Sequence, residues 1–272
     1  MRLADAGELG LLAELERRGL AVGIDNDAAE LPGGRVVTQD ALVEAVHFRL
    51  DRISWRDLGY RAAAVNLSDL AACGADPEGL VVTLVAPSET AVADVVELYE
   101  GLAEAGVPVI GGDTSAGDRL VLSVTALGRS ARVPGRGGAR PGDVLVVTGP
   151  LGAAGAAFRA QGYVRPPLRL DEGKRLAAVA GALTDISDGL AQDAAHIAAR
   201  SGCKLLVELD RVPLAAGATV EDLGFGEDYE LLAAVRDAGP FAEIGRCLEG
   251  EGVELRLGGE PVELPGFEHF AG

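Results

Sequence analysis

The sequence contains few residues that bind metals through sulfur or nitrogen, with 3 Cys and 3 His among its 272 residues. Cys73, Cys203 and Cys247 lie far apart and form no Cys-x-x-Cys pair. The sequence therefore predicts neither a disulfide framework nor a thiolate metal site.

Long apolar runs are also absent. No apolar stretch approaches the roughly 20 residues that a membrane span needs. The N-terminal segment 1–19 contains acids where a signal peptide would have an uninterrupted apolar region. We therefore expect a cytoplasmic protein that has no membrane partner.

Lysine is scarce: Lys174 and Lys204 are the only lysines, and the other 22 of the 24 basic residues are arginines. The phosphate-binding pattern Gly-x-x-x-x-Gly-Lys-Ser/Thr is missing. Any phosphate chemistry must therefore depend on metal ions, backbone N–H groups and arginines. With 42 acidic residues, the net charge of −18 repels nucleic-acid phosphates, which excludes a role in coating DNA or RNA.

The hydrophobic content of 48% is enough for a sizeable core and excludes a disordered or fibrous chain. The length fits one large domain or two of roughly 100–150 residues. The 38 glycines fall in turns between short apolar runs, which predicts an α/β fold of the α+β type. We expect helices at 8–18, 55–73, 91–105 and after Ser187, and strands at 35–38, 80–86, 107–110, 120–127, 143–148, 204–209 and 229–235.

A stretch rich in Gly, Pro and Arg, residues 129–142, has almost no large apolar side chains. Such a composition is typical of a linker between domains. We therefore predict two domains, residues 1–130 and residues 131–272.

Aspartates flank several apolar segments, where an acid that only increases solubility is least expected. Two lie in the loop Asp25-Asn26-Asp27. Others end or follow a strand, or precede a helix: Asp40, Asp113, Asp185 and Asp188. Each has an ordinary explanation taken singly, since an aspartate at a helix cap or turn accepts hydrogen bonds from free backbone N–H groups.

Asp69 is harder to explain as a cap. In the helix predicted at 55–73 it shares one face with apolar positions at three- and four-residue spacing: Leu58, Ala62, Val65 and Ala72. Burying an unpaired charge costs on the order of several kcal/mol, so this carboxylate needs a cation or dense hydrogen bonding. A salt bridge, for example to Arg61, would satisfy it, and so would a metal ion. An all-oxygen ligand set suits Mg²⁺ better than Zn²⁺.

Three other candidates stay open on the residues alone. His47 fits a satisfied core histidine or a functional one. The glycine-rich turn 149–155 could hold a phosphate at a helix N-terminus or serve close packing. Glu227 and Asp228 precede a strand, where a capping role explains them as well as a ligand does.

Six stretches of the sequence resemble, in order, those of the thiamine-monophosphate kinase family: 40–48, 65–72, 111–114, 138–149, 185–190 and 226–231. The resemblance extends from about residue 8 to residue 270. It includes Gly111-Gly-Asp-Thr114 and Asp185-Ile-Ser-Asp-Gly-Leu190. This family belongs to a superfamily with the aminoimidazole ribonucleotide synthetases, the selenophosphate synthetases and a hydrogenase-maturation protein.

The resemblance implies an aminoimidazole ribonucleotide synthetase-like fold of two α/β domains. The N-terminal half is expected to pair across a homodimer, and ATP to bind between the halves. The implied Mg²⁺ ligands are Asp27, Thr38, Gln39, Asp40, Asp69, Asp113, Asp185 and Asp188. The implied catalytic acids are Asp27, Asp40, Asp69, Asp113 and Asp188. The implied nucleotide contacts are Tyr99, Gly112, Asp113, Arg136 and Ser187, and the implied substrate contacts are His47, Glu227 and Phe267.

The implied reaction transfers the γ-phosphoryl group of ATP, directly and in line, to the phosphate of thiamine monophosphate. That phosphate is already ionised at neutral pH, so no general base is needed. The difficulty is to bring two anions together, and aspartates that hold several Mg²⁺ ions would do so without lysine. Arg136 would add a bidentate phosphate contact.

The sequence departs from the family in three respects. It has Asp25-Asn26-Asp27 where relatives usually have Gly-Asp-Asp, and Gln39 where they have Thr. It also looks shorter between residues 155 and 184 and between residues 212 and 226, which concerns the shape of the substrate pocket.

Two alternative functions stay open. One is another ATP-dependent synthetase or dehydratase of the superfamily, but His47-Phe48 favours the kinase. The absence of a cysteine- or lysine-rich N-terminal segment also disfavours selenophosphate synthesis. The other is a nucleotide-binding regulatory protein that has lost catalysis. A regulator needs fewer metal ligands than the six aspartates that this chain retains: Asp27, Asp40, Asp69, Asp113, Asp185 and Asp188.

Overall fold

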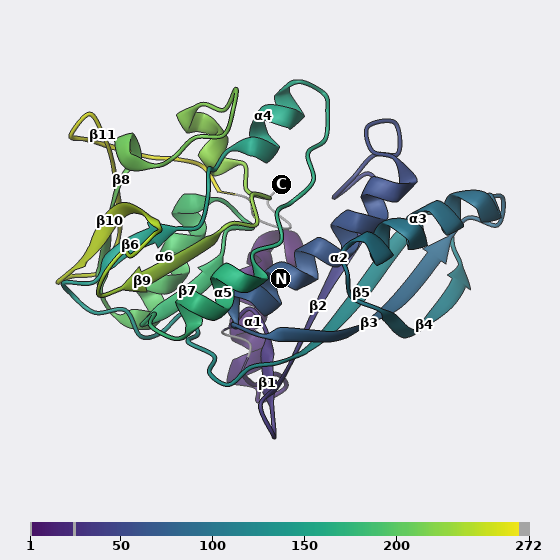
Figure 1. Ribbon diagram of the computed structural model, residues 1–272, viewed down its shortest axis with the longest axis horizontal. Helices are drawn as coiled ribbons and strands as arrows, with labels where there is room; N and C mark the ends of the chain where they lie inside the picture. Colours follow the sequence, from purple (N-terminus) through teal and green to yellow (C-terminus); the bar gives the residue numbers. More distant parts are fainter. Residues whose placement is uncertain (1, 24–25, 267–272) are drawn as a thin grey trace.

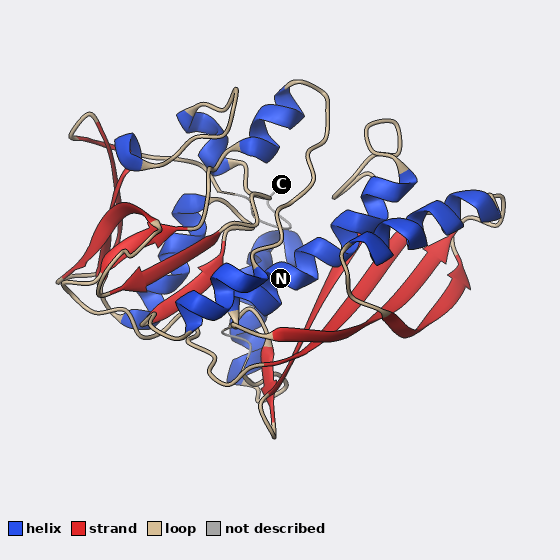
Figure 2. Ribbon diagram, in the orientation of Figure 1, coloured by secondary structure: helices blue, strands red, loops and turns tan. Residues whose placement is uncertain are grey.

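A computed structural model describes residues 2–23 and 26–266 of the chain. It contains two β-sheets, one from each half of the sequence, with helices packed on them (Figures 1 and 2). This arrangement confirms the α/β fold class. Within the described residues, no helix is long and apolar enough to cross a membrane.

The first sheet has five strands in the order β1-β2-β5-β3-β4. Its strands are β1 (Ala29–Leu31), β2 (Arg35–Val43), β3 (Asp76–Ala86), β4 (Val109–Ala116) and β5 (Val121–Arg129). β3 and β4 are parallel neighbours, and the other pairs are antiparallel. Residues of β5 alternate between the faces: Leu122 and Val124 are buried in the core, whereas Ser123 and Thr125 lie half-buried on the outer face.

Helices α2 (Trp55–Ala72) and α3 (Val92–Glu104) pack against each other on the inner face of this sheet (Figure 2). Ser54 is the N-cap of α2, and its Oγ accepts a hydrogen bond from the Asp57 backbone N–H at 3.0 Å. The two helices contact each other at glycines. A Cβ on Gly59 would stand 1.8 Å from the Leu98 carbonyl oxygen. The helix α1 (Leu3–Arg17) precedes this sheet in the sequence.

The second sheet has seven strands in the order β12-β11-β8-β10-β6-β9-β7. Its strands are β6 (Val144–Val147), β7 (Ala182–Asp185), β8 (Lys204–Glu208), β9 (Leu231–Val235), β10 (Ala242–Leu248), β11 (Gly252–Leu257) and β12 (Glu260–Val262). Its helices are α4 (Ala153–Arg159), α5 (Leu170–Ala177), α6 (Leu190–Ser201) and the 3-10 helices η1 (Leu209–Arg211) and η2 (Val220–Gly224).

The strands β7 and β9 are buried on both faces because different helices cover each side. On one face, Ala182 and Leu232 pack with α6. On the other face, Leu183 and Ala233 pack with α5 and with Ala71 near the end of α2. Helix α2 therefore contributes to the cores of both halves.

Helices α2 and α5 are packed so closely that glycine is required where their backbones meet. A Cβ on Gly173 of α5 would stand 2.1 Å from the Ala71 carbonyl oxygen. Gly74, which follows α2 with φ of +61°, would place a Cβ 2.3 Å from that of Ala177. These glycines bring the last turn of α2, which contains Asp69, against the second sheet.

The structure also corrects several expected elements. β4 begins at Val109 and continues to Ala116, so Gly111, Gly112 and Asp113 lie inside a strand and do not follow one. The expected strands missed β1, β10, β11 and β12, and the short β7 and the helix α5 were not expected either. β7 has only four residues, too few to show a period in sequence. The domain boundary after residue 130 stays a prediction; the two sheets end and begin at Arg129 and Val144.

We predict that Gly59→Ala destabilises the protein by about 1–3 kcal/mol, because the new methyl group forces α2 and α3 apart. Helix propensity alone would make the same change stabilising by about 1 kcal/mol. Urea denaturation measures the difference. Gly10→Ala in α1 is the matched control, since its Cβ would meet only the Ala6 Cβ at 3.4 Å. A Gly59→Ala variant as stable as Gly10→Ala would contradict the close packing.

Candidate active site

Three aspartates from distant parts of the sequence have carboxylate oxygens within 4.8 Å of one another: Asp27, Asp69 and Asp185. Asp27 precedes β1, Asp69 lies in the last turn of α2, and Asp185 ends β7. We call Asp27, Asp69 and Asp185, together with the neighbouring Asp40, the aspartate cluster. It forms where the end of α2 meets the second sheet, so both halves contribute to it.

Hydroxyl groups orient these carboxylates. Ser68 Oγ donates a hydrogen bond to Asp185 Oδ2 at 2.6 Å. Thr184 Oγ1 donates to Asp27 Oδ1 at 3.0 Å. Thr38 Oγ1 donates to Asp69 Oδ2. Ser68 and Thr184, each adjacent in sequence to one aspartate of the cluster, therefore hold a different aspartate in place.

Arg136 is the basic residue that contacts the cluster within the described ranges. Its Nη2 lies 2.5 Å from Asp27 Oδ1, and its backbone N–H donates to Asn26 Oδ1 at 3.1 Å. The salt bridge considered for Asp69 is not formed, because Arg61 pairs with Glu227 instead. One guanidinium group therefore faces several carboxylates.

The close approach of these acids changes their proton affinities. Burial raises the pKa of Asp69 well above its ordinary value, and the charges of Asp40 and Asp185 raise it further. Burial also raises the pKa of Asp40, while a hydrogen bond with Asp69 opposes the change. Burial, and then the charge of Asp27, raises the pKa of Asp185 to about 8.

These shifts mean that the carboxyl groups retain protons, because Arg136 alone cannot neutralise them when they are all ionised. A cation in contact with the carboxylates would relieve this repulsion. The donor set consists of carboxylate and hydroxyl oxygens, the ligands that Mg²⁺ prefers. The residues present therefore fit a magnesium site.

Helix α6 and the turn before it contribute a second group of potential ligands. Asp188, Asp193 and His196 have ligand atoms within 4.8 Å of one another. The backbone N–H groups of Ser187 and Asp188 both donate to Asp193 Oδ2 at 3.1 Å, so the buried Asp193 holds the turn that carries two of the expected site residues. Sequence reasoning missed Asp193 and His196, although their i, i+3 spacing after Asp188 was the signal that could have found them.

Gln39 does not reach the cluster. It lies on the outer face of the first sheet, where its Nε2 donates to Ser123 Oγ at 2.9 Å and its Oε1 accepts from Thr125 Oγ1 at 3.3 Å. Its neighbours Thr38 and Asp40 point to the inner side because successive residues of a strand alternate between faces.

Gly112 and Asp113 also lie away from the cluster of their own chain. Asp113 lies opposite Thr83 on β3. Thr83 in turn lies opposite Ser123 on β5, and Ser123 lies opposite Ala41 on β2. β4 is thus three strands from β2, about 14 Å at the usual strand spacing. Asp113 lies on the exposed edge strand, on the same outer face as Ser123.

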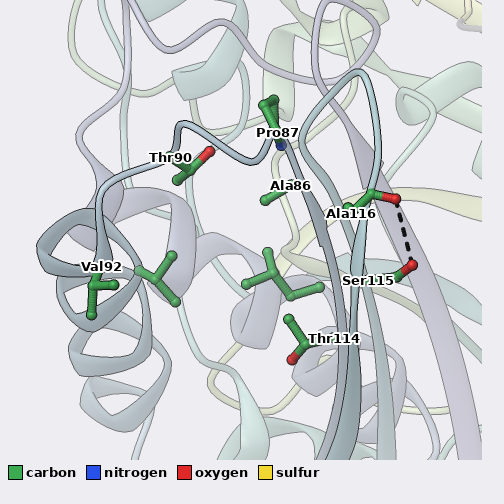
Figure 3. Close-up of a pocket in the computed structure, with 9 residues that line it drawn as sticks. Ala86, Pro87, Thr90, Val92, Thr114, Ser115 and Ala116 are labelled. Atoms are coloured by element: carbon green, nitrogen blue, oxygen red, sulfur yellow. Dashed lines mark hydrogen bonds between the residues drawn. The ribbon is translucent and has the colours of Figure 1, made fainter.

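Two hollows border α3, and both are mainly apolar. The first has a volume of about 340 Å³ between the ends of β3 and β4 and the start of α3, where Thr90, Val92 and Thr114 contribute to its wall (Figure 3). The second, about 390 Å³, runs along α3 and includes Tyr99. Val92 borders both hollows, and neither contains a carboxylate of the cluster.

A third polar group joins the halves on the substrate side expected from the sequence. Arg61 of α2 pairs with Glu227, and its Nη1 donates to the His47 carbonyl oxygen at 2.8 Å. His47 is a half-buried turn residue, whose Nδ1 accepts a hydrogen bond from the Val43 backbone N–H at 2.9 Å. The structure brings His47 and Glu227 together through Arg61. Phe267 and Asp25 lie outside the described residues.

The glycine-rich turn 149–155 does not present free N–H groups for a phosphate. Both carboxylate oxygens of Asp228 accept from the Gly152 backbone N–H at 2.9 Å, and Oδ1 also accepts from that of Ala153 at 3.1 Å. An aspartate therefore already occupies the N-terminus of α4. The capping explanation holds for Asp228.

Comparisons with known proteins agree with this architecture. The family model for the AIR synthase related protein N-terminal domain matches residues 25–130, and that for the C-terminal domain matches residues 140–267. The thiamine-monophosphate kinase of Aquifex aeolicus is 33% identical, and the match covers 99% of this chain and 100% of the relative. That of Methanopyrus kandleri is 38% identical over 85% of this chain and 84% of the relative.

Solved structures agree as well. The structure of AaThiL complexed with AMPPCP and TMP has a TM-score of 0.91 at 33% identity and covers 99% of both chains. A hydrogenase-maturation protein HypE in complex with ATP has a TM-score of 0.72 at 19% identity, covering 99% of both chains, which shows a shared fold alone. With matches to relatives along nearly its whole length, the chain belongs to the thiamine-monophosphate kinase family.

Proposed function

We propose that this protein is a cytoplasmic enzyme of thiamine diphosphate biosynthesis. It would phosphorylate thiamine monophosphate with ATP to give thiamine diphosphate and ADP. The observation that carries the proposal is the aspartate cluster, in which the buried Asp185 and several half-buried carboxylates lie close together without enough basic residues to neutralise them. The relatives' activity and the complex with AMPPCP and TMP support it.

The aspartate cluster would hold Mg²⁺, with Asp27, Asp40, Asp69 and Asp185 as ligands from both halves of the chain. Thr38 already donates its hydroxyl hydrogen to Asp69, and its oxygen is placed to join this set. When bound, the ions would supply the positive charge that offsets the repulsion between two phosphate groups.

The remaining residues of the site position and shield the reactants. Arg136 holds Asp27 and would contact a phosphate of the nucleotide, while Ser187 and Asp188 would approach from the turn that Asp193 holds. No side chain needs to remove a proton, since the attacking phosphate oxygen is already ionised. We therefore propose direct in-line transfer without a phosphorylated enzyme intermediate.

The nucleotide base would bind beside α3 and β4. The hollow along α3 contains Tyr99 and is otherwise mainly apolar, which suits a purine ring better than a phosphate group. Gly112 and Asp113 lie on β4, the next element after α3 in the chain.

This placement separates the nucleotide-side residues of one chain from its own aspartate cluster by three strands. We propose that a homodimer closes the gap. The outer face of the first sheet, which carries Gln39, Ser123 and Asp113, would pack on the same face of a second copy. Asp113 of one protomer would then act as a Mg²⁺ ligand together with the aspartate cluster of its partner.

The direct test of the function is incubation of the purified protein with ATP, Mg²⁺ and thiamine monophosphate. We expect thiamine diphosphate and ADP in equal amounts. Free thiamine should not be phosphorylated, because its hydroxyl needs a base that the site does not place. Comparable turnover of free thiamine, or none of thiamine monophosphate, would refute the proposal. A protein that binds ATP without turnover would instead support the regulatory alternative.

Within that assay, Asp69→Asn should lower kcat by at least about a hundredfold, because the amide keeps the shape of the side chain but not the charge that holds Mg²⁺. Thermal stability should be retained or rise, since one repelling carboxylate has left the cluster. Asp171→Asn is the control, because this acid on α5 is 87% exposed. A variant that melts early yet retains activity below its melting point would show that Asp69 is structural.

The free energy of unfolding of the metal-free protein should fall between pH 6 and pH 8. The folded state keeps a proton on Asp185 up to its pKa of about 8, whereas the unfolded chain has lost it above about pH 4. Each rise in pH within this window therefore favours unfolding, by about 2 kcal/mol in total for this group. Urea denaturation in EDTA measures the change. Saturating Mg²⁺ should reduce it, and stability that rises toward pH 8 without metal would contradict the charged cluster.

Mixing two inactive variants tests the shared site. Asp69→Asn and Asp113→Asn should each lose activity alone, but hybrids formed by subunit exchange contain one site with both wild-type residues. Random exchange should restore about a quarter of wild-type activity. As a control, Asp69→Asn mixed with Asp185→Asn should stay inactive, because both lesions lie in one cluster. If the first mixture also stays inactive after exchange is shown, Asp113 acts within its own chain.

A further inference from the structure

Arg61 is a charged residue on the core-facing side of α2. It is 5% exposed, and its neighbours three positions before and four positions after it, Leu58 and Val65, are buried as well. A buried ion pair is often no more stable than apolar residues of similar volume, because both charges lose their contacts with water. Stability is therefore a weak reason for an arginine at this position, and its contacts indicate a different one.

The guanidinium group of Arg61 joins a turn of the first half to an acid of the second half. Its Nη1 donates a hydrogen bond to the His47 carbonyl oxygen at 2.8 Å, and its Nη2 donates to Glu227 Oε1. The planar fork of arginine fixes the angle between these two bonds, whereas the ammonium group of lysine is a point charge on a flexible stem. One side chain therefore sets the position of the Glu227 carboxylate relative to His47.

The turn that carries His47 has a fixed shape of its own. The Ala45 N–H donates to the Phe48 carbonyl oxygen at 2.8 Å, and the His47 N–H donates to that of Val43 at 2.9 Å. Ala45 has φ of +63°, a left-handed conformation that is uncommon for a residue with a Cβ. Arg61 therefore binds a turn whose backbone is already held in place.

The backbone of Glu227 is held by the second half. Its N–H donates to the Ser187 carbonyl oxygen at 2.8 Å, and a Cβ on Gly226 would stand 2.3 Å from the same oxygen. Glu227 has φ of +59°, which costs free energy for a residue with a side chain and is often found at ligand sites. The second half thus places the Cα of Glu227, and Arg61 from the first half orients its carboxylate.

The Glu227 carboxylate can be reached from solvent although Arg61 cannot. The side chain of Glu227 is 33% exposed, whereas that of Arg61 is 6% exposed. Burial raises the pKa of Glu227, and the charge of Arg61 opposes this rise, which favours the ionised carboxylate. An ionised carboxylate accepts hydrogen bonds and attracts cations. The ion pair therefore presents a fixed, partly exposed acceptor next to the expected substrate residue His47.

Helix α2 carries Arg61 and Asp69 eight positions apart, which is about 12 Å along the helix axis. Asp69 belongs to the aspartate cluster, where Mg²⁺ would hold the phosphate groups. The ring portion of thiamine monophosphate carries a positively charged thiazolium and an amino group, both of which suit a carboxylate. A substrate whose phosphate lies at the cluster would therefore direct its rings toward the acid that Arg61 holds.

We infer that Arg61 is a positioning residue for the ring portion of the substrate, an inference that rests on the proposed function. Arg61 is too deeply buried to bind the substrate itself, and it acts through Glu227. It holds one oxygen of the Glu227 carboxylate, so that the exposed part of this group faces the substrate in a single orientation. Because this contact is made equally before and during phosphoryl transfer, it contributes to binding and not to the rate of the chemical step.

Arg61→Met removes the guanidinium group and keeps a long apolar side chain. We expect KM for thiamine monophosphate to rise about tenfold or more, the loss of one hydrogen bond to a charged group. The kcat should change less than about threefold, and KM for ATP less than about twofold. Assays are run below the melting temperature of each variant, so that a less stable fold does not affect the comparison.

A double-mutant cycle tests whether Arg61 acts through Glu227. Glu227→Gln alone should raise KM for thiamine monophosphate as Arg61→Met does, and the double variant should have a KM within about twofold of either single variant. Arg61→Lys, which keeps the charge but not the fork, supplies the same comparison if Arg61→Met does not fold. It should give a smaller rise in KM that also disappears in the Glu227→Gln background.

Arg165→Met is the matched control, because this arginine also joins the halves. It lies in the connection between α4 and α5 and bonds to Asp57 on α2 and Glu104 on α3, each at 2.6 Å. Its loss should leave KM for thiamine monophosphate within about twofold of wild type. An equal rise in the control would show that Arg61 only holds the halves together, and would overturn the inference.

Two other results would also overturn the role of Arg61 and leave the proposed function intact. One is a wild-type KM in a folded Arg61→Met variant of an active enzyme. The other is a double variant whose rise in KM is the product of the two single rises, since Arg61 would then act independently of Glu227. A wild-type protein that does not phosphorylate thiamine monophosphate would instead refute the proposed function, and this inference with it.

Discussion

Mutual repulsion among closely spaced carboxylates, which are half-buried or buried, is the constraint on which the site depends. Asp27, Asp69 and Asp185 come from a loop, a helix and a strand, and each would be more stable apart from the others. Their positions are imposed by packing: the glycine contact between α2 and α5 brings Asp69 to the second sheet, and hydroxyl groups hold the carboxylates in place. The fold therefore holds acidic groups closer together than they would lie in solvent, and in the proposed function this is what would hold Mg²⁺ there.

The other polar interactions of the site also lie at the interface between the two halves. Arg61 reaches from α2 to Glu227, and Arg169 holds Glu230 from the connection after α4. Lys174 of α5 also reaches Asp76 at the start of β3, at 2.8 Å. The chain has only two lysines, so most of these salt bridges are formed by arginine. The planar guanidinium group of arginine can make two hydrogen bonds with one carboxylate.

The position of Asp113 has a different cause. Gly112 has φ of +158°, and a Cβ there would stand 2.0 Å from the Val82 carbonyl oxygen, so β4 lies very close to β3. The exposed edge strand presents Asp113 to the outside of the chain. A charged side chain is common on an exposed edge strand, where it discourages pairing with other chains, and the proposed homodimer would give Asp113 a further role there.

The sequence predicted those features of the fold that depend on residues close together in the chain. The helix expected at 55–73 is α2, and the apolar spacing along it singled out Asp69. Ser54 and Gly74 are residues of the types that cap and end a helix. The family resemblance predicted the α/β fold. The roles assigned to Asp27, Asp40, Asp69, Asp113, Asp185 and Asp188 stay predictions, but four of these acids do converge.

Only the tertiary structure decided which partner each acid has. Sequence spacing cannot show that Arg61 binds Glu227, 166 positions away, and leaves Asp69 to the cluster. Nor can it show that Asp228 fills the N-terminus of α4 or that Asp193 holds the Ser187 turn. These are contacts between segments whose relative position depends on how two sheets pack around α2, and local preferences carry no information about that packing.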